Sequence, residues 1–150
     1  GGTAIVMDPE TGEILALANY PTFNPNAFNK FTDEERRNRA VQDVYEPGST
    51  FKIVTASEAL EGGVIAPNEM IDTNPGVITL PGRDPITEAS SHNYGLLSFE
   101  DVIVRSSNVG AVKIGLRVGA DRMVEFMHRF GFGQTMGTDF SLRPAFLAPL

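Results

Sequence analysis

Two short apolar runs near the N-terminus constrain the possible folds most strongly. Residues 3–7 and 13–19 are rich in β-forming residues, and the five residues between them include Pro9 and Gly12, which favour a tight turn. The pattern therefore predicts a β-hairpin. Its apolar residues occur at successive positions and not at alternate ones, so other parts of the molecule are expected to cover both faces. Two strands alone are rarely stable in water, and further packing partners are required.

The remaining regular structure is predicted to be mostly helical. Capping residues, apolar spacing and glycines indicate helices over about 33–40, from near Ser49 to Gly62, and over about 99–104, 109–117 and 120–130. The stretch 64–97 contains four prolines and is expected to form loops with two small strands, around Ile71 and at 77–79. The expected fold class is therefore α+β and rich in helix.

Size and charge limit the classes of function. A chain of 150 residues with 41% hydrophobic content can form one core, which predicts a single domain over residues 1–150. The net charge of −7 argues against nucleic acid or an anionic membrane surface as a partner. No apolar run is long enough to span a bilayer, and no signal segment is visible at the start.

Metal and cofactor chemistry is not indicated. The absence of cysteine excludes disulfides, thiolate nucleophiles and cysteine metal ligands. His92 and His128 show no spacing typical of a metal pair or of a serine–histidine triad, so structural roles are expected for both. The prediction is a protein without a metal or cofactor.

The stretch from Glu46 to Lys52 carries the clearest indication of chemistry. Pro47 and Gly48 interrupt the chain just before Ser49, and Ser49 and Lys52 are three residues apart, so both can lie on one helix face. A serine needs a neighbouring base, and lysine can act as one only if its pKa is lowered. On spacing alone, the pair also fits a helix-capping serine beside a surface lysine.

A second polar segment, Ser106-Ser107-Asn108, follows at a predicted break between helices. Ser106 could relay a proton between Lys52 and a leaving nitrogen, and the Asn108 amide could hold a substrate carbonyl and also orient Lys52. Backbone amides at the helix start, including that of Ser49, could stabilise the developing oxyanion. No acidic residue is placed clearly enough to be named as a deacylating base, although Glu46, Glu88 and Asp101 lie near the motifs in sequence.

These segments together resemble the transpeptidase domain of class B penicillin-binding proteins. The resemblance covers roughly residues 3–139 and rests on the segments 5–16, 38–40, 45–52, 92–95 and 106–108. It implies a serine acyl-transferase of the penicillin-recognising fold, which also includes serine β-lactamases, with Ser49 as the acylated nucleophile, Lys52 as the base, and Ser106 and Asn108 as the second motif. It also implies β-lactam or D-alanyl-D-alanine peptide substrates and a periplasmic or other extracytoplasmic location.

The sequence departs from the family pattern in its third motif, K-T-G or K-S-G. Lys30, Lys52 and Lys113 are each followed by another residue type, Phe or Ile. The family domain also continues beyond the point where this chain stops, so the expectation is a C-terminally truncated fold with an N-terminal hairpin and a helical subdomain. The resemblance assigns substrate carboxylate binding to the missing strand, which argues against full transpeptidation. An open site would let water compete for the acyl-enzyme, which predicts hydrolysis of β-lactams or simple esters.

Two further expectations concern association of the hairpin and the C-terminal stretch. The hairpin would keep an unpaired edge and an uncovered face, which predicts a homodimer or a domain-swapped assembly. The apolar stretch 140–150 is predicted to dock on apolar surface. An alternative to the enzyme hypothesis is a catalytically inactive fragment that serves as a fold or interaction module.

Overall fold

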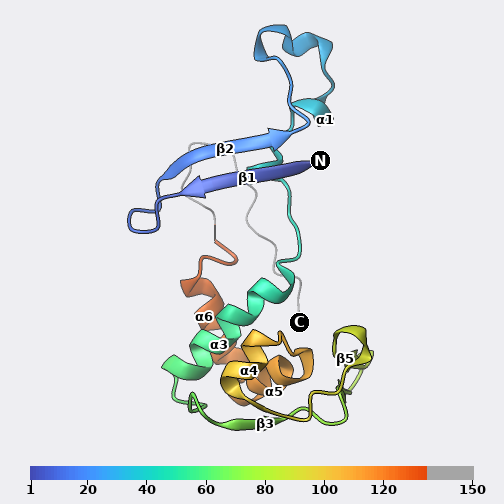
Figure 1. Cartoon of the computed structure of the whole chain (residues 1–150). Coiled ribbons are helices and arrows are strands. Elements are labelled where there is room, and N and C mark those ends of the chain that lie inside the picture. The colour runs from blue at the N-terminus through green and yellow to red at the C-terminus, as the bar shows by residue number, and fades with distance from the viewer. Residues whose placement is uncertain (135–150) are drawn as a thin grey trace. The chain divides into compact units, whose positions relative to one another are not determined.

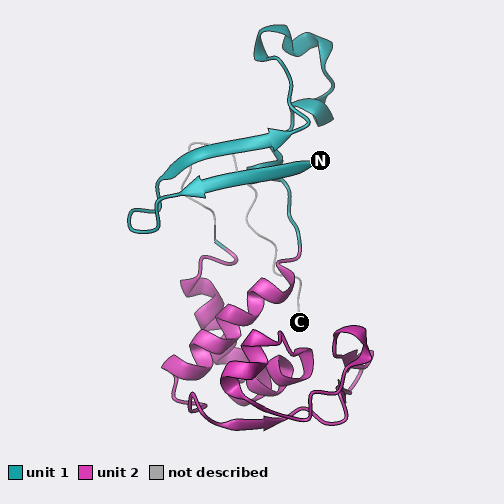
Figure 2. Ribbon diagram, in the orientation of Figure 1, with its two compact units in different colours: residues 1–45, 134–150 teal, residues 46–133 magenta. Residues whose placement is uncertain are grey.

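The computed structural model describes residues 1–134. These residues form helices and three separate two-stranded antiparallel sheets, in agreement with a helix-rich α+β fold. The chain divides into two compact units, one built on residues 1–45 and the other comprising residues 46–133 (Figure 2). The single domain over 1–150 stays a prediction, and the two units are described separately.

The predicted hairpin is confirmed in the first unit. Strand β1 (Gly2–Met7) pairs with β2 (Ile14–Tyr20), and the register shifts between Val6 and Met7. The turn is closed by the Asp8 carboxylate, which accepts hydrogen bonds from the backbone amides of Glu10 at 2.8 Å and Thr11 at 2.9 Å. This arrangement is an Asx turn, in which a short polar side chain replaces a backbone acceptor.

The coverage of both hairpin faces that its apolar pattern predicts is absent among the described residues, whereas the uncovered face expected of a truncated domain is present. Every residue of β1 is exposed, and Val6 and Met7 retain more than half of their accessible surface. Within its unit the hairpin is contacted by the single helical turn α2 (Arg39–Gln42), to which Asn19 is bound through Asn38 and the Ala40 amide. One turn of helix is too small to cover two strands.

The predicted helix over 33–40 is also wrong in its extent. It is two single turns, α1 (Asp33–Arg36) and α2, separated by an extended residue at Arg37. The capping box at Thr32 and Glu35 is present as predicted. The helix is interrupted where Asn38 takes other partners: its side chain accepts from Asn19 of β2, and its backbone amide donates to the side chain of Gln42. A 3-10 helix, η1 (Pro25–Lys30), precedes α1.

The second unit contains the other predicted helices, and all are confirmed within one or two residues at their ends (Figure 1). They are the 3-10 turn η2 (Gly48–Phe51) with α3 (Lys52–Glu61), followed by α4 (Phe99–Val104), α5 (Asn108–Val118) and α6 (Ala120–Arg129). Ser98 and Ser107 cap α4 and α5 by accepting backbone amide hydrogen bonds. Gly62 and Gly63 end α3 as expected.

Two small antiparallel pairs connect α3 to α4. Strand β3 (Met70–Asp72) pairs with β6 (Leu96–Ser98), and β4 (Val77–Ile78) pairs with β5 (Ile86–Thr87). The strands near Ile71 and at 77–78 were predicted from the sequence, whereas their partners β5 and β6 were not. A further 3-10 turn, η3 (Ala89–Ser91), follows β5.

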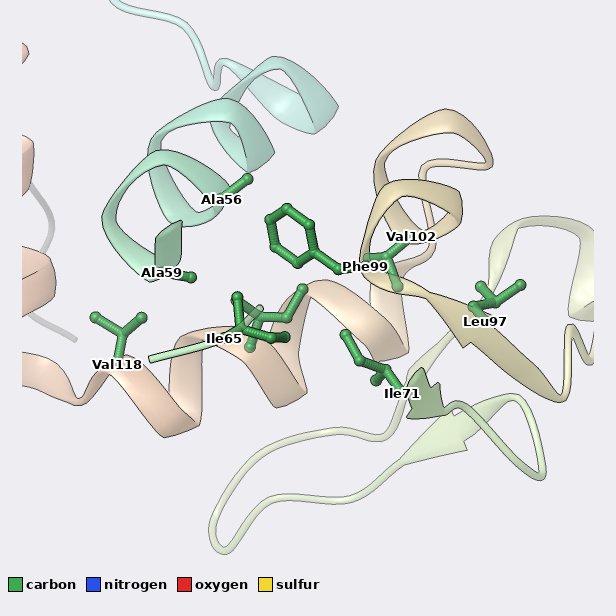
Figure 3. Close-up of a cluster of buried hydrophobic side chains, with 9 residues drawn as sticks. Ala56, Ala59, Ile65, Ile71, Leu97, Phe99, Val102 and Val118 are labelled. Atoms are coloured by element: carbon green, nitrogen blue, oxygen red, sulfur yellow. The ribbon is translucent and has the colours of Figure 1, made fainter. Parts of the chain in front are cut away.

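The main hydrophobic core lies among α3, α4, α5 and the β3–β6 pair. Its buried members are Ala56, Ala59, Ile65, Ile71, Leu97, Phe99, Val102, Ile114 and Val118 (Figure 3). In Figure 3 the ring of Phe99 points from α4 toward α3. A second cluster joins Val54 of α3 to Phe126 and Met127 of α6. Because α3 is held by both clusters, the start of α3 has a fixed place beside the turn between α4 and α5.

No helix among residues 1–134 is both long enough and apolar enough to cross a membrane. The predicted docking of the segment 140–150 lies outside the described residues.

Candidate active site

The Lys52 ammonium group contacts the other three residues that were predicted to form a site with it. Its Nζ atom lies 3.3 Å from the Ser49 hydroxyl, 2.8 Å from the Ser106 hydroxyl and 2.8 Å from Asn108 Oδ1. The Ser106 carbonyl oxygen is a fourth acceptor, at 2.5 Å. The structure therefore brings together two segments that are more than 50 residues apart in sequence.

The local backbone explains why Ser49 and Lys52 face each other. Gly48 has a φ of 59°, which an L side chain rarely adopts, and it turns the chain into η2. Residues three apart lie directly above one another in a 3-10 turn, so Ser49 and Lys52 share one side. The Ser49 side chain caps neither η2 nor α3, and Lys52 is partly buried. The alternative of a capping serine beside a surface lysine does not describe this geometry.

The turn between α4 and α5 presents its polar groups to Lys52 through an unusual backbone conformation. Ser106 has a φ of 54°, in the left-handed region that residues other than glycine seldom occupy. With the chain turned in this way, the carbonyl and the hydroxyl of Ser106 both accept from Lys52. Asn108 then begins α5, and its side-chain nitrogen Nδ2 donates to the Thr87 carbonyl oxygen at 2.8 Å.

Burial and charge act on Lys52 in opposite directions. Loss of solvent lowers the pKa of Lys52 below its ordinary value of 10.5, and the nearby negative charge of Glu88 raises the pKa by a smaller amount. An ammonium group has three hydrogens and so cannot donate to all four neighbouring acceptors at once. A neutral amine has two hydrogens and one lone pair, so it can donate to two acceptors and accept a proton from a hydroxyl. Desolvation therefore shifts Lys52 toward the neutral amine that general-base chemistry needs, whereas Glu88 and the surrounding acceptors favour the ammonium form.

Glu88 is a buried part of this site, and the sequence indicated only that it lies near the motifs, not what it contacts. Its side chain is only 2% exposed, and its carboxylate accepts from the Ser107 hydroxyl at 2.5 Å and the Asn108 amide at 2.6 Å. The Val109 amide is a third donor, at 3.3 Å. Glu88 is 19 to 21 residues from these partners, and no local pattern in the sequence signals the contact.

The other polar residues near the motifs are placed elsewhere. Asp101 takes part in the N-terminal cap of α4 with Ser98, and Glu46 is exposed. The exposed His92 ring stacks on Tyr94 at 5.7 Å. Within residues 1–134, no group of three or more histidine, aspartate and glutamate side chains is arranged to hold a metal ion.

This geometry can be compared with that of known proteins. A sequence model described as the penicillin binding protein transpeptidase domain matches residues 2–144. The chain belongs to this family. The resemblance inferred from the separate motifs is therefore confirmed.

Relatives and solved structures agree with this assignment. The "Probable peptidoglycan D,D-transpeptidase PenA" of Neisseria gonorrhoeae is 42% identical over 139 residues, which are 93% of this chain and 23% of the relative. The peptidoglycan D,D-transpeptidase FtsI of Escherichia coli K12 is 38% identical over 133 residues, 89% of this chain and 22% of FtsI. A crystal structure of the D,D-transpeptidase domain of a peptidoglycan glycosyltransferase from Eggerthella lenta has a TM-score of 0.82 at 33% identity, over 93% of this chain and 35% of that chain.

The comparisons also define how much of the family this chain represents. It spans less than a quarter of the length of these two curated relatives and about a third of the solved transpeptidase chain. The predicted partial penicillin-recognising fold, with its hairpin and helical subdomain, is confirmed at that level.

Proposed function

We propose that this protein is a serine acyl-transferase of penicillin-binding type in which Ser49 is acylated by β-lactams or by D-alanyl-D-alanine-like peptides. Family membership supports the general class of reaction, since the relatives are named as peptidoglycan D,D-transpeptidases. The single observation that carries the residue assignment is Lys52 Nζ within hydrogen-bond distance of Ser49, Ser106 and Asn108. The same names support a location outside the cytoplasm, where peptidoglycan is found.

The proposed acylation step assigns one role to each residue. Ser49 Oγ attacks the carbonyl carbon of the substrate amide while the neutral amine of Lys52 accepts the hydroxyl proton. The carbon–nitrogen bond then breaks, and the proton passes from Lys52 through the Ser106 hydroxyl to the leaving nitrogen. The products of the step are an ester on Ser49 and a neutral amine, which stays tethered when the substrate is a β-lactam.

The second half of the reaction depends on what attacks the ester. Attack by an amine completes a transfer, whereas attack by water gives hydrolysis and regenerates Ser49. Ser49 is exposed in the structure, so water has access to the position of the ester. We therefore propose hydrolysis of β-lactams or simple esters as an activity of this chain, beside acyl transfer.

Mass spectrometry of the intact protein tests the proposal directly. Incubation with a β-lactam should add the mass of the antibiotic, and peptide mapping should place it on Ser49. Ser49→Ala should abolish the adduct, and Lys52→Ala should slow its formation by about 10²- to 10⁴-fold, the usual contribution of a general base. Lys30→Ala, which removes a lysine from the other unit, should leave acylation unchanged.

Two results would contradict the proposed function. A wild-type protein that forms no adduct would favour the catalytically inactive fold or interaction module instead. An adduct that persists in Ser49→Ala would remove Ser49 from the reaction, and an unchanged rate in Lys52→Ala would remove Lys52 from the role of base.

A further inference from the structure

The first turn of α5 is held by a carboxylate that is almost completely removed from solvent. Glu88 accepts hydrogen bonds from the Asn108 and Val109 amides, and Ser107 Oγ accepts from the Gly110 amide at 2.9 Å. The Ser107 hydroxyl proton is then free to bond Glu88, which it does at 2.5 Å. Three amides that a helix start would leave unpaired are thereby satisfied.

Thr87, the residue before Glu88, fixes the side chain of Asn108. The Thr87 carbonyl oxygen accepts from Asn108 Nδ2 at 2.8 Å. With the nitrogen end of the amide turned toward Thr87, the oxygen end faces Lys52 Nζ, also at 2.8 Å. Asn108 is therefore held at its backbone by Glu88 and at its side chain by Thr87, and its orientation toward Lys52 follows from both contacts.

The Thr87–Glu88 segment is itself anchored. Thr87 pairs with Val77 in the β4–β5 ladder, and the Glu88 amide donates to the Gly76 carbonyl oxygen at 3.0 Å. Gly76 has a φ of 85°, and a Cβ built there would lie 2.3 Å from the His92 carbonyl oxygen, so this close approach requires glycine. The small β4–β5 arm thus has a defined contact with the first turn of α5.

We propose that the Thr87–Glu88 segment is a positioning element of the acylation site, which holds Asn108 and the adjoining Ser106 in the orientation that Lys52 requires. This inference rests on the proposed function of Ser49 and Lys52. Glu88 is not itself a catalytic residue: its two carboxylate oxygens carry three hydrogen bonds and its surface is 2% exposed. A deacylating base must reach a water molecule, and the burial of Glu88 together with its three hydrogen bonds opposes that role.

Glu88→Gln provides the main test in the full chain. The glutamine amide has one acceptor oxygen and one donor nitrogen, so whichever way it is turned, at least one amide of the α5 N-terminus faces another donor. The acylation rate by a fluorescent penicillin should fall by about 10- to 100-fold, because a small displacement of a site residue costs that much. Glu88→Asp, which keeps the charge on a shorter side chain, should restore part of the rate.

The pH profile separates positioning from simple support of the fold. Around Lys52 the described neighbours are neutral groups of Ser49, Ser106 and Asn108, and Glu88 is the charged residue that acts on its pKa. Loss of the negative charge in Glu88→Gln lowers the pKa of Lys52 further. The rise of acylation rate with pH should therefore begin at lower pH in Glu88→Gln, and should return toward the wild-type position in Glu88→Asp.

Glu58→Gln is the matched control. Glu58 is a second buried carboxylate of the same unit, 6% exposed and bound to Arg122 at 2.7 Å between α3 and α6. Its substitution should lower the thermal unfolding temperature without changing the pH profile of acylation. If Glu58→Gln and Glu88→Gln affect the rate and the pH profile equally, Glu88 has only a structural role and the proposal is wrong.

Failure of this inference can be distinguished from failure of the proposed function. If the wild-type protein forms no adduct on Ser49, the proposed function fails and the positioning role fails with it. If the wild type is acylated and Glu88→Gln is acylated at the same rate with the same pH profile, the positioning role alone is overturned.

Discussion

To act as a base, the side chain of Lys52 must meet two requirements that oppose each other. It must be buried enough to lose its proton, yet it must stay hydrogen-bonded, because an unpaired polar group out of solvent is costly. The surrounding acceptors from Ser106 and Asn108 satisfy the second requirement. Desolvation is the larger influence on its pKa and lowers it, which acts in the direction of the first requirement.

The lowered pKa of Lys52 predicts how acylation depends on pH. Because only the neutral amine accepts a proton, the acylation rate should increase as pH rises through the pKa of Lys52. That pKa is below the ordinary 10.5, so the half-maximal rate should be reached at a pH lower than 10.5. Rapid mixing with a chromogenic β-lactam across a pH series measures the midpoint.

Lys52→Arg provides the control for this pH profile. An arginine keeps the positive charge and cannot lose its proton in proteins, so acylation should be slow at every pH. A wild-type midpoint at or above 10.5, or a rate independent of pH, would contradict the role of Lys52 as a base.

The sequence was sufficient to name the four polar residues of the candidate site but not the groups that support them. Ser49 and Lys52 were predicted from a spacing of three and a chain-breaking Pro-Gly pair, both of which are local features. Their catalytic roles stay predictions. Glu88 could not be found in this way, because glutamate is rarely buried and its partners come from a segment 19 to 21 residues later.

At the scale of elements, helices and strands were predicted correctly where a local signal was strong, and incorrectly where tertiary contacts determine the structure. The capping signature at Ser98 predicted a helix start that the structure contains. The break at Arg37 depends on contacts of the next residue, Asn38, with β2, which no capping or periodic pattern records. Strands β5 and β6 are two and three residues long, too short for a clear alternation of apolar residues.

Two glycines of α5 predict opposite effects on stability. A Cβ built on Gly110 would lie 2.7 Å from a Val102 methyl group of α4, whereas the nearest atom to one on Gly115 is 3.7 Å away, on Thr55. Gly110→Ala should therefore destabilise by about 1–2 kcal/mol, since overpacking exceeds the gain in helix propensity. Gly115→Ala should stabilise by about 0.5–1 kcal/mol. Urea unfolding measures both, and a stabilised Gly110→Ala would show that α4 and α5 are not in such close contact.

For the whole molecule, the hairpin is the feature that most favours association with another chain. Strands β1 and β2 form a two-stranded sheet, so each has one edge without a neighbouring strand among the described residues. Large apolar side chains on it, including Ile5, Val6 and Leu15, are exposed. An open edge with apolar faces is a template for pairing with another chain.

We therefore propose that the 150-residue chain forms a homodimer through this hairpin. Light scattering at micromolar concentration should give twice the monomer mass, and Val6→Lys should shift it toward the monomer, since charge on an edge strand opposes pairing. Thr11→Lys makes the same charge change in the turn and should leave the dimer intact. A monomeric mass for the unmodified chain would contradict the proposal.

The distance along the chain between Lys52 and its partners also determines when reactivity can appear during folding. The hairpin strands are joined by a short turn and can pair early, whereas Lys52 meets Ser106 and Asn108 across 54 and 56 residues. Closing such long loops costs entropy before any contact compensates for it. The pKa of Lys52 is therefore not lowered until α3 has docked beside the α4–α5 turn. A short peptide with the segment from Ser49 to Lys52 would carry an ordinary serine and an ordinary lysine.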